Sequence, residues 1–129
     1  MKIFVDSDVL IWHLRGDARA TGLLRELKDR TGCELWTGAI QRAEILFHAR
    51  SEEMGPTLRF LGMMRTAPVT ASIVDDAARM FRKWHPSHGV DAADALLSAT
   101  AARAGGKIIT LNEKHFPMPE AAAERAWKD

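Results

Sequence analysis

Four polar residues lie beside apolar segments in a pattern that suits a metal-dependent hydrolytic site. Asp6 directly follows an apolar run at residues 2–5, and Asn112 follows another at residues 107–111. Glu44 and Asp94 lie within apolar helical patterns at residues 39–47 and 91–104. A carboxylate on an apolar face is costly unless it is paired, hydrogen-bonded or bound to a metal. We therefore expect these four side chains to share a chemical role.

The donor types indicate which metal such a site would hold. Converging carboxylates repel one another and drive one of them to protonate, and a divalent cation removes that conflict. The chain has one cysteine, Cys33, and its five histidines show no metal-ligand spacing. Oxygen donors alone favour Mg²⁺ or Mn²⁺ over Zn²⁺. A magnesium ion held by few carboxylates keeps positions for water and phosphate oxygens, so phosphoester chemistry is predicted.

Alternating short apolar runs and amphipathic helices must position these residues. Strands are predicted at residues 2–5, 33–37, 67–69 and 107–111. Helices are predicted after Asp6 to residue 14, before Gly32, from residue 39, from Gly55-Pro56, over 73–84 and over 91–104. Residues 85–89 are predicted to form a loop, residues 112–116 a short turn or helix, and the tail at 119–127 an amphipathic helix.

This alternation predicts an α/β fold whose short sheet is mostly parallel, with helices on both faces. Pro68 predicts an edge position for the third strand. In open sheets of this kind, ligands bind beyond the carboxyl ends of the strands. Asp6 and Asn112 follow two of these ends, and Glu44 and Asp94 belong to neighbouring helices. The four residues are therefore expected to meet at one edge of the sheet.

Length and composition predict one domain over residues 1–129. Hydrophobic residues make up 47%, and 18 basic residues against 17 acidic ones give a net charge of +1. A domain that coats nucleic acid is usually far more basic, so a polyanion would be held only at a local site. A lone cysteine forms no intrachain disulfide, and no segment approaches the roughly 20 apolar residues of a membrane span. A cytoplasmic location without membrane contact is expected.

Four segments in order resemble the acidic motifs of PIN-domain ribonucleases. They are Ile3–Ile11, Thr37–Ile45, Asp94–Ala101 and Ile109–Phe116, and the last is a Thr-x-Asp/Asn segment that ends in Phe. Their order and spacing match the family along nearly the whole chain. Size and the last two motifs look most like the VapC toxins of toxin–antitoxin pairs.

The resemblance implies a fold, an activity and partners. The fold would be a PIN-like three-layer α/β/α arrangement with a sheet of four or five strands. The activity would be that of a Mg²⁺-dependent endoribonuclease, with RNA as substrate. The partners would be a small VapB-type antitoxin and a second copy in a homodimer. Sequence gives no indication of the RNA target.

By position, the resemblance also implies roles for single residues. Asp6 and Asp94 look like metal ligands, and Glu44 like the second acid, which positions a metal-bound water or serves as a ligand. Thr110 and Asn112 would line the site. From their charge alone, Arg15 and Lys114 are candidate phosphate contacts.

The chain departs from the family pattern at two places. The fourth acidic position is Asn112, a neutral amide, so a second metal ion would bind weakly if at all. Asp8 or Asp91 are the candidates to supply the missing charge, although both also suit a helix cap. The tail has no apolar run, so the last strand of the family is expected to be missing or displaced.

Alternatives stay open at this level. Asp6 would also serve as a helix cap, Asp94 as a first-turn acid, and Glu44 as an ion-pair partner of Arg42 or His48. Among the histidines, His115 is the one considered for substrate contact. Alternative functions are a PIN nuclease that matures RNA, a non-catalytic RNA- or partner-binding module, and a haloacid-dehalogenase-like phosphatase. The phosphatase motif would use Asp6-Ser7-Asp8, but Leu10 stands where Thr or Val is expected.

Overall fold

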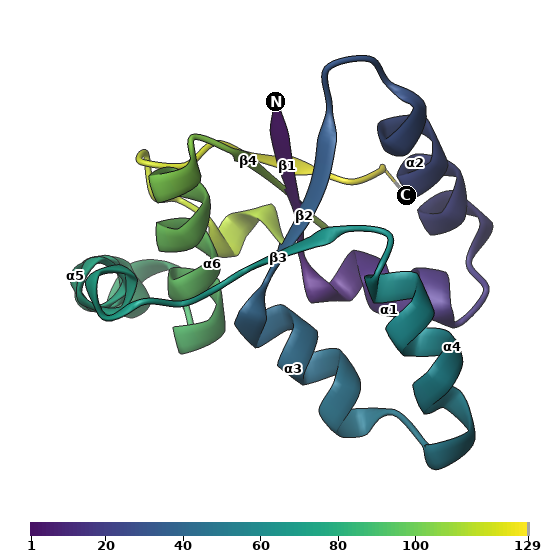
Figure 1. The fold of residues 1–129 in the computed structure, drawn as a ribbon. Helices are drawn as coiled ribbons and strands as arrows, with labels where there is room; N and C mark the ends of the chain where they lie inside the picture. The colour runs from purple at the N-terminus through teal and green to yellow at the C-terminus, as the bar shows by residue number, and fades with distance from the viewer. Residues whose placement is uncertain (129) are drawn as a thin grey trace.

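The computed structural model describes residues 1–128 and contains a five-stranded parallel sheet (Figure 1). The strands are β1 (Lys2–Val5), β2 (Glu34–Gly38), β3 (Arg65–Ala67), β4 (Lys107–Thr110) and β5 (Ala123–Arg125). Their spatial order is β3-β2-β1-β4-β5, with every neighbouring pair parallel. The predicted α/β class with a parallel sheet is confirmed, and β3 with the adjoining Pro68 does lie at an edge.

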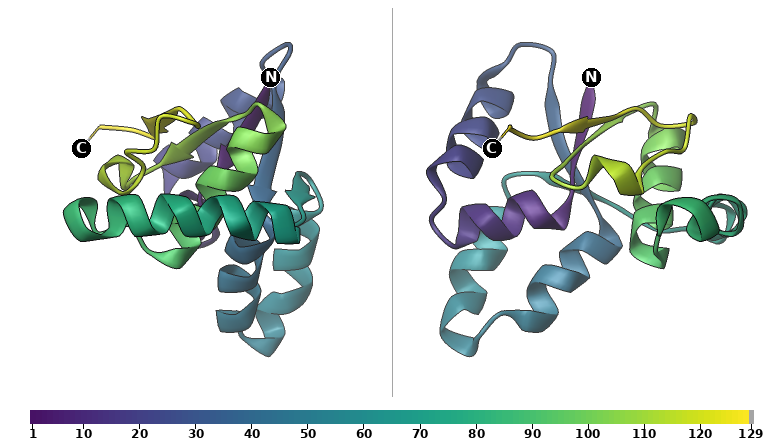
Figure 2. Two further views of the ribbon diagram at one scale, coloured as in Figure 1. Left: turned by 90° about the vertical axis from the view of Figure 1, so that its left-hand side faces the viewer. Right: turned by 180° about the vertical axis from the view of Figure 1, so that it is seen from behind.

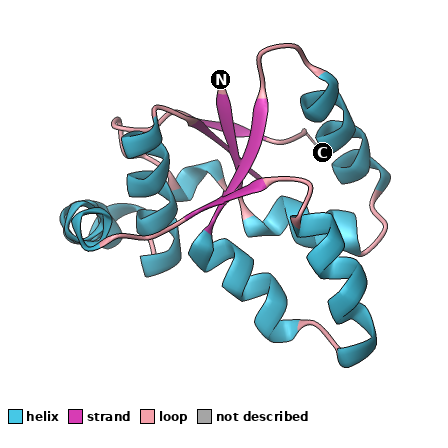
Figure 3. Cartoon of the chain, viewed as in Figure 1, coloured by secondary structure: helices cyan, strands magenta, loops and turns pink. Residues whose placement is uncertain are grey.

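Within residues 1–128, six α-helices and one short 3₁₀ helix connect the strands (Figure 3). They are α1 (Ser7–Leu14), α2 (Ala18–Asp29), α3 (Ala39–His48), α4 (Ser51–Leu61), α5 (Ala71–His88), α6 (Ala92–Ala104) and η1 (Glu113–His115). Among the described residues, no helix combines the length and the apolar character that crossing a bilayer requires.

Helices lie on both sides of the sheet (Figure 2), and the side chains of the central strand β1 alternate between two core layers. Phe4 packs on one face with residues of α5 and α6, including Leu97. Ile3 and Val5 pack on the other face with residues of α1 and α2, including Leu10. Because all strands are parallel, their carboxyl ends share one edge, where β1 leads into α1 and β2 leads directly into α3.

Two helix boundaries differ from the prediction, and each involves a proline. Helix α4 begins at Ser51 rather than Gly55, and it contains Pro56. Glu53 explains the earlier start, because its carboxylate accepts the backbone N–H of Arg50 at 2.9 Å and satisfies one free donor of the first turn. Because Pro56 has no backbone N–H, the helix contains one fewer intrahelical hydrogen bond at this position.

The predicted loop at residues 85–89 is also wrong, because α5 continues to His88 and includes Pro86. The His85 ring stacks on Phe81 with ring centroids 4.7 Å apart, and its Nδ1 lies 2.8 Å from the carbonyl of Val90. Gly89 then ends the helix with a φ of +64°, a left-handed conformation that glycine adopts without strain.

The tail forms a strand rather than a helix, so both expectations for residues 119–127 are wrong. Ala123–Arg125 pairs with β4 in parallel register, and Ala126 N–H donates to the Thr110 carbonyl at 2.8 Å. A strand at the sheet edge needs little apolar character, because one side of it stays in contact with water. The family's last strand is therefore present, although its sequence carries no apolar run.

Candidate active site

Asp6 is a buried carboxylate at the carboxyl end of β1, where it also caps α1. Asp6 as a whole is only 9% exposed. Its Oδ1 accepts the backbone N–H of Ser7 at 2.8 Å, and its Oδ2 accepts the hydroxyl of Thr110 at 2.9 Å. The capping and the functional interpretation are thus compatible, because each oxygen keeps a second lone pair.

Thr110 lies between the carboxylates of Asp6 and Asp8 and orients both. Thr110 is fully buried, and its Oγ1 lies within hydrogen-bond distance of both Asp6 and Asp8, at 2.9 and 3.2 Å. The same Oγ1 accepts the backbone N–H of Asn112. Asp8 Oδ2 also accepts the backbone N–H of Leu111 at 3.0 Å. This geometry leaves no surface of Thr110 for substrate and gives it a role in orienting carboxylates.

Asp94 lies in the first turn of α6, where one of its oxygens is engaged and the other is not. Its Oδ2 accepts the backbone N–H of Asp91 at 3.1 Å and lies 3.3 Å from Nδ1 of His115. Among the described residues, Oδ1 has no hydrogen-bond partner. Asp91 in turn caps α6 by accepting the backbone N–H of Asp94 at 2.8 Å. The cap therefore turns one Asp94 oxygen toward the protein and leaves the other available.

Glu44 is exposed, although helical spacing predicts a position beside the apolar stripe of its helix, where burial would be costly. The buried positions of α3 are Gln41 and Ile45, and Glu44 lies just outside them. Phe47, which the same pattern placed in the core, is 82% exposed. Glu44 nevertheless belongs to the site, because its Oε1 accepts the hydroxyl of Ser7 at 3.1 Å.

Burial and mutual repulsion raise the pKa values of the central acids. Burial raises the pKa of Asp6 from 3.8 to about 7, and the charges of Asp8 and Asp94 add to the shift. Burial also raises the pKa of Asp94 to about 7, with smaller contributions from Asp91 and Glu44. The pKa of Asp8 is raised too, chiefly by burial. Acids that influence one another in this way form one strongly negative site, which a cation would stabilise.

The remaining predicted residues lie around these acids. Asn112 is exposed, and its Nδ2 lies 2.8 Å from Nδ1 of His115, the atom that also faces Asp94. Lys114 is exposed on η1, between Asn112 and His115 in the sequence. Arg15 lines a groove of about 680 Å³ whose wall includes Glu44. The contact between His115 and Asp94 was not predicted from the sequence, which led us to consider His115 for substrate contact only. Its position three residues after Asn112, one helical turn along, is the sequence signal that could have placed it near the site.

The carboxylate oxygens of the site are donors that suit a magnesium ion, although they do not form a closed cage of protein ligands around one. Within residues 1–128, no three His, Cys, Asp or Glu side chains are grouped closely enough to hold a metal ion on their own. Mg²⁺ does not require such a cage, because it is commonly held by one or two carboxylates and completed by water and phosphate oxygens. Asp6 and the unpaired oxygen of Asp94 are the carboxylate donors that such a site would use.

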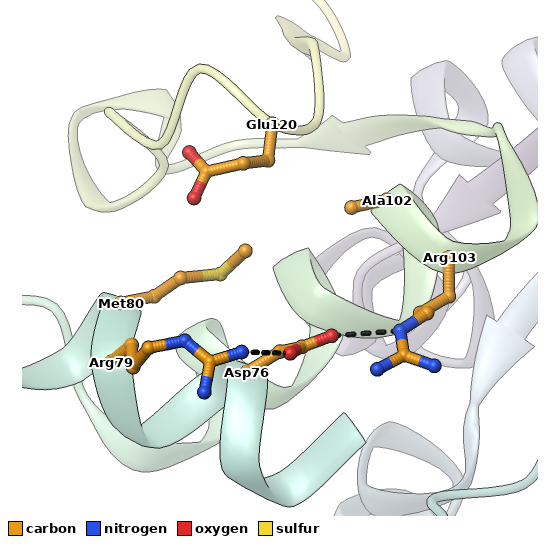
Figure 4. Close-up of a pocket in the computed structure, with 6 residues that line it drawn as sticks. All are labelled: Asp76, Arg79, Met80, Ala102, Arg103 and Glu120. Carbon is orange, nitrogen blue, oxygen red and sulfur yellow. Dashed lines mark hydrogen bonds and ion pairs between the residues drawn. The ribbon is translucent and has the colours of Figure 1, made fainter. Parts of the chain in front are cut away.

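A second pocket, of about 300 Å³, lies between α5 and α6 and contains none of these acids (Figure 4). Asp76 in this pocket pairs with Arg79 of its own helix and with Arg103 of α6, at 2.7 Å for the second pair. The carboxylate of Asp76 links α5 to α6 and offsets part of the charge of the two arginines. This arrangement indicates a role in helix packing, so the carboxyl edge of the sheet is the stronger candidate for an active site.

Comparison of the whole sequence with known proteins identifies its family. The PIN domain model matches residues 3–121. Ribonuclease VapC19 of Mycobacterium tuberculosis is 34% identical over 119 residues, which cover 92% of this chain and 94% of VapC19. Ribonuclease VapC10 of the same organism is 37% identical over 119 residues, which cover 92% and 88%.

Solved structures agree on the fold. The VapBC2 structure from Rickettsia felis, bound to a DNA fragment from its promoter, matches with a TM-score of 0.80 and 17% identity over 99% of this chain and 100% of that one. The VapBC-1 structure from nontypeable Haemophilus influenzae matches with a TM-score of 0.75 and 14% identity over 98% of each chain.

The chain therefore belongs to the PIN-domain family. Within that family its curated relatives are VapC proteins, so it is a PIN domain of the VapC type. This assignment confirms the resemblance drawn from the four acidic segments. It also disfavours the phosphatase alternative, since the match begins at β1 and includes Asp6-Ser7-Asp8 within a PIN domain.

Proposed function

We propose that this protein is a Mg²⁺-dependent endoribonuclease and the toxin of a VapBC-type toxin–antitoxin pair. The observation that carries the proposal is the placement of Asp6 and Asp94 at the start of α1 and of α6, at the carboxyl edge of a PIN sheet. Burial there raises the pKa values of both acids to about 7. The curated relatives of this chain are named ribonucleases, and its structural neighbours include toxin–antitoxin complexes.

Each residue of the site has a part in this mechanism. Mg²⁺ (or Mn²⁺), when bound, would polarise the scissile phosphodiester and lower the pKa of the attacking water. Asp6 and Asp94 would hold the ion through carboxylate oxygens, while the hydroxyl of Thr110 would fix the orientation of Asp6. Glu44, which is exposed and accepts the hydroxyl of Ser7, would accept a hydrogen bond from the attacking water.

The neutral and basic residues would hold the RNA. Asn112 and Lys114 follow the carboxyl end of β4, and Arg15 lines the same groove as Glu44. RNA that contacts both Lys114 and Arg15 would pass close to the acids. Water attack on the phosphorus would leave a 3′-hydroxyl and a 5′-phosphate.

We also propose the partners that this assignment carries with it: a small VapB-type antitoxin, and a second copy of the chain in a homodimer. Structures of relatives such as VapBC2 contain the antitoxin together with the toxin. A toxin that acts on cellular RNA would work in the cytoplasm as one PIN domain.

RNA cleavage by the purified chain tests the proposal. The wild-type protein should cleave a single-stranded RNA with Mg²⁺ and should stop when EDTA is added. Asp6→Asn and Asp94→Asn should abolish cleavage with the fold retained by circular dichroism, and the exposed control Asp75→Asn should remain active. Full activity in either site variant, or activity that persists in EDTA, would contradict the proposed mechanism.

Two further outcomes distinguish the remaining alternatives. A folded chain that binds RNA without cleaving it and shows no response to Mg²⁺ would be the non-catalytic module. Cleavage without growth arrest on induction would indicate an RNA-maturation nuclease instead of a toxin. Growth arrest that Asp94→Asn relieves, and that co-expression of an adjacent small reading frame relieves, would support the toxin.

A further inference from the structure

A buried glutamine connects the two helices that carry Glu44 and Asp94. Gln41 is 1% exposed in the first turn of α3, three residues before Glu44. Its Nε2 donates a hydrogen bond to the backbone carbonyl of Ala93, the residue before Asp94, at 3.1 Å. One side chain thus links the helix of Glu44 to the backbone beside Asp94.

The other end of this amide is unsatisfied. Among the described residues, Oε1 of Gln41 is buried and has no hydrogen-bond partner. Rotating the amide by half a turn would bring that oxygen against the carbonyl of Ala93, so two acceptors would face each other. A glutamine at this helical position commonly accepts the N–H of the capping residue, but Gln41 makes no such bond. A buried unpaired oxygen destabilises a fold, and its presence calls for an explanation.

The residue before the helix is shaped to fit this amide. A Cβ added to Gly38 would lie only 2.2 Å from Oε1 of Gln41. Gly38 has a φ of −88°, which any residue adopts, so its backbone conformation does not require glycine. The absence of a side chain at Gly38 instead provides the space in which the amide reaches Ala93.

We propose that Gln41 is a positioning residue: its bond to Ala93 fixes the start of α6, and with it the ligand Asp94, against the helix that carries Glu44, and thereby sets the affinity of the site for Mg²⁺. The inference rests on the proposed function, because it assumes that these acids serve a bound metal. Groups that orient metal ligands from outside typically change metal affinity tenfold or more when removed. The unpaired oxygen is then a stability cost retained for the geometry of the site.

The variant Gln41→Met separates positioning from packing. Methionine has a similar length and fills the same space, but it removes both the bond to Ala93 and the unpaired oxygen. We expect the Tm without metal to be unchanged or higher, and the Mg²⁺ concentration that gives half of the Mg²⁺-induced Tm rise to increase about tenfold. The measurement uses thermal unfolding without RNA, over a Mg²⁺ titration. The control Thr100→Val removes another buried hydrogen bond of α6, to Leu96, and should leave the Mg²⁺ midpoint unchanged.

A second variant keeps the test independent of Gln41 itself. Gly38→Ala should displace the amide from Ala93 and raise the Mg²⁺ midpoint as Gln41→Met does, and the double variant should be no worse than the more affected single one. A wild-type midpoint in Gln41→Met, or additive effects in the double variant, would overturn the positioning role. If the wild-type Tm does not respond to Mg²⁺ at all, the proposed metal-dependent function fails instead.

Discussion

Replacement of Asp6 by asparagine should stabilise the metal-free protein. Burial raises the pKa of Asp6 from 3.8 to about 7, so the folded state favours the protonated acid while the unfolded chain ionises near 3.8. A carboxyl group with a raised pKa loses its contribution to stability as the pH rises between these two values. Wild-type stability in EDTA should therefore fall between about pH 4 and 7 and stay low above that range.

The size of the effect follows from the shift. A pKa change of about three units corresponds to about 4 kcal/mol between the ionised and the protonated acid at pH 8. Asparagine keeps one oxygen for the N–H of Ser7 or the hydroxyl of Thr110, but not for both, and that loss costs about 1–2 kcal/mol. The net gain of Asp6→Asn at pH 8 should be about 2 kcal/mol, which is a rise in Tm of roughly 6 °C for a domain of this size.

The assay is thermal unfolding in EDTA at pH 5 and pH 8, for wild type and Asp6→Asn. The gain should be clearly smaller at pH 5, because the wild-type acid is then mostly protonated in the folded state. Asp75→Asn, an exposed carboxylate on α5, should give no pH-dependent difference. A loss of Tm in Asp6→Asn at pH 8, or a gain of equal size at both pH values, would refute the explanation based on burial.

Three further variants test other parts of the site. Asp94→Asn should lower RNA cleavage more than about 100-fold and remove the Mg²⁺-induced Tm rise, both measured on the same preparation. Thr110→Val should raise the Mg²⁺ midpoint about tenfold, because Asp6 and Asp8 lose the hydroxyl donor that they share. Thermal unfolding over a Mg²⁺ titration measures this midpoint. Arg103→Ala should leave cleavage rates and the Mg²⁺ midpoint at wild-type values, because its exposed pair with Asp76 lies outside the site.

The sequence was most informative where one element determines a residue's position. Asp6 follows an apolar strand, and the carboxyl ends of parallel strands share an edge, so its place could be predicted without tertiary information. The same holds for Asp94 at the start of α6. Four ordered acidic segments were enough to predict the family.

Features that depend on a neighbour were predicted less well. Helical spacing placed Glu44 beside an apolar stripe, but the face of α3 that is buried depends on how α6 packs against it. Strand β5 has no apolar pattern, because pairing with β4 and not burial forms it. Pro56 and Pro86 suggested helix boundaries, whereas tertiary contacts and caps compensate for the missing N–H groups.

The structure favours Asp8 over Asp91 as the source of the charge that Asn112 lacks. Asp91 is exposed, and its side chain is engaged in capping α6. Asp8 is partly buried, its charge raises the pKa of Asp6, and the backbone N–H of Leu111 holds it beside β4. Since both Asp8 oxygens already accept hydrogen bonds, its role would be to supply negative charge rather than to bind metal directly. In the proposed site, two ligating acids and one supporting acid would suit a single Mg²⁺ better than a pair.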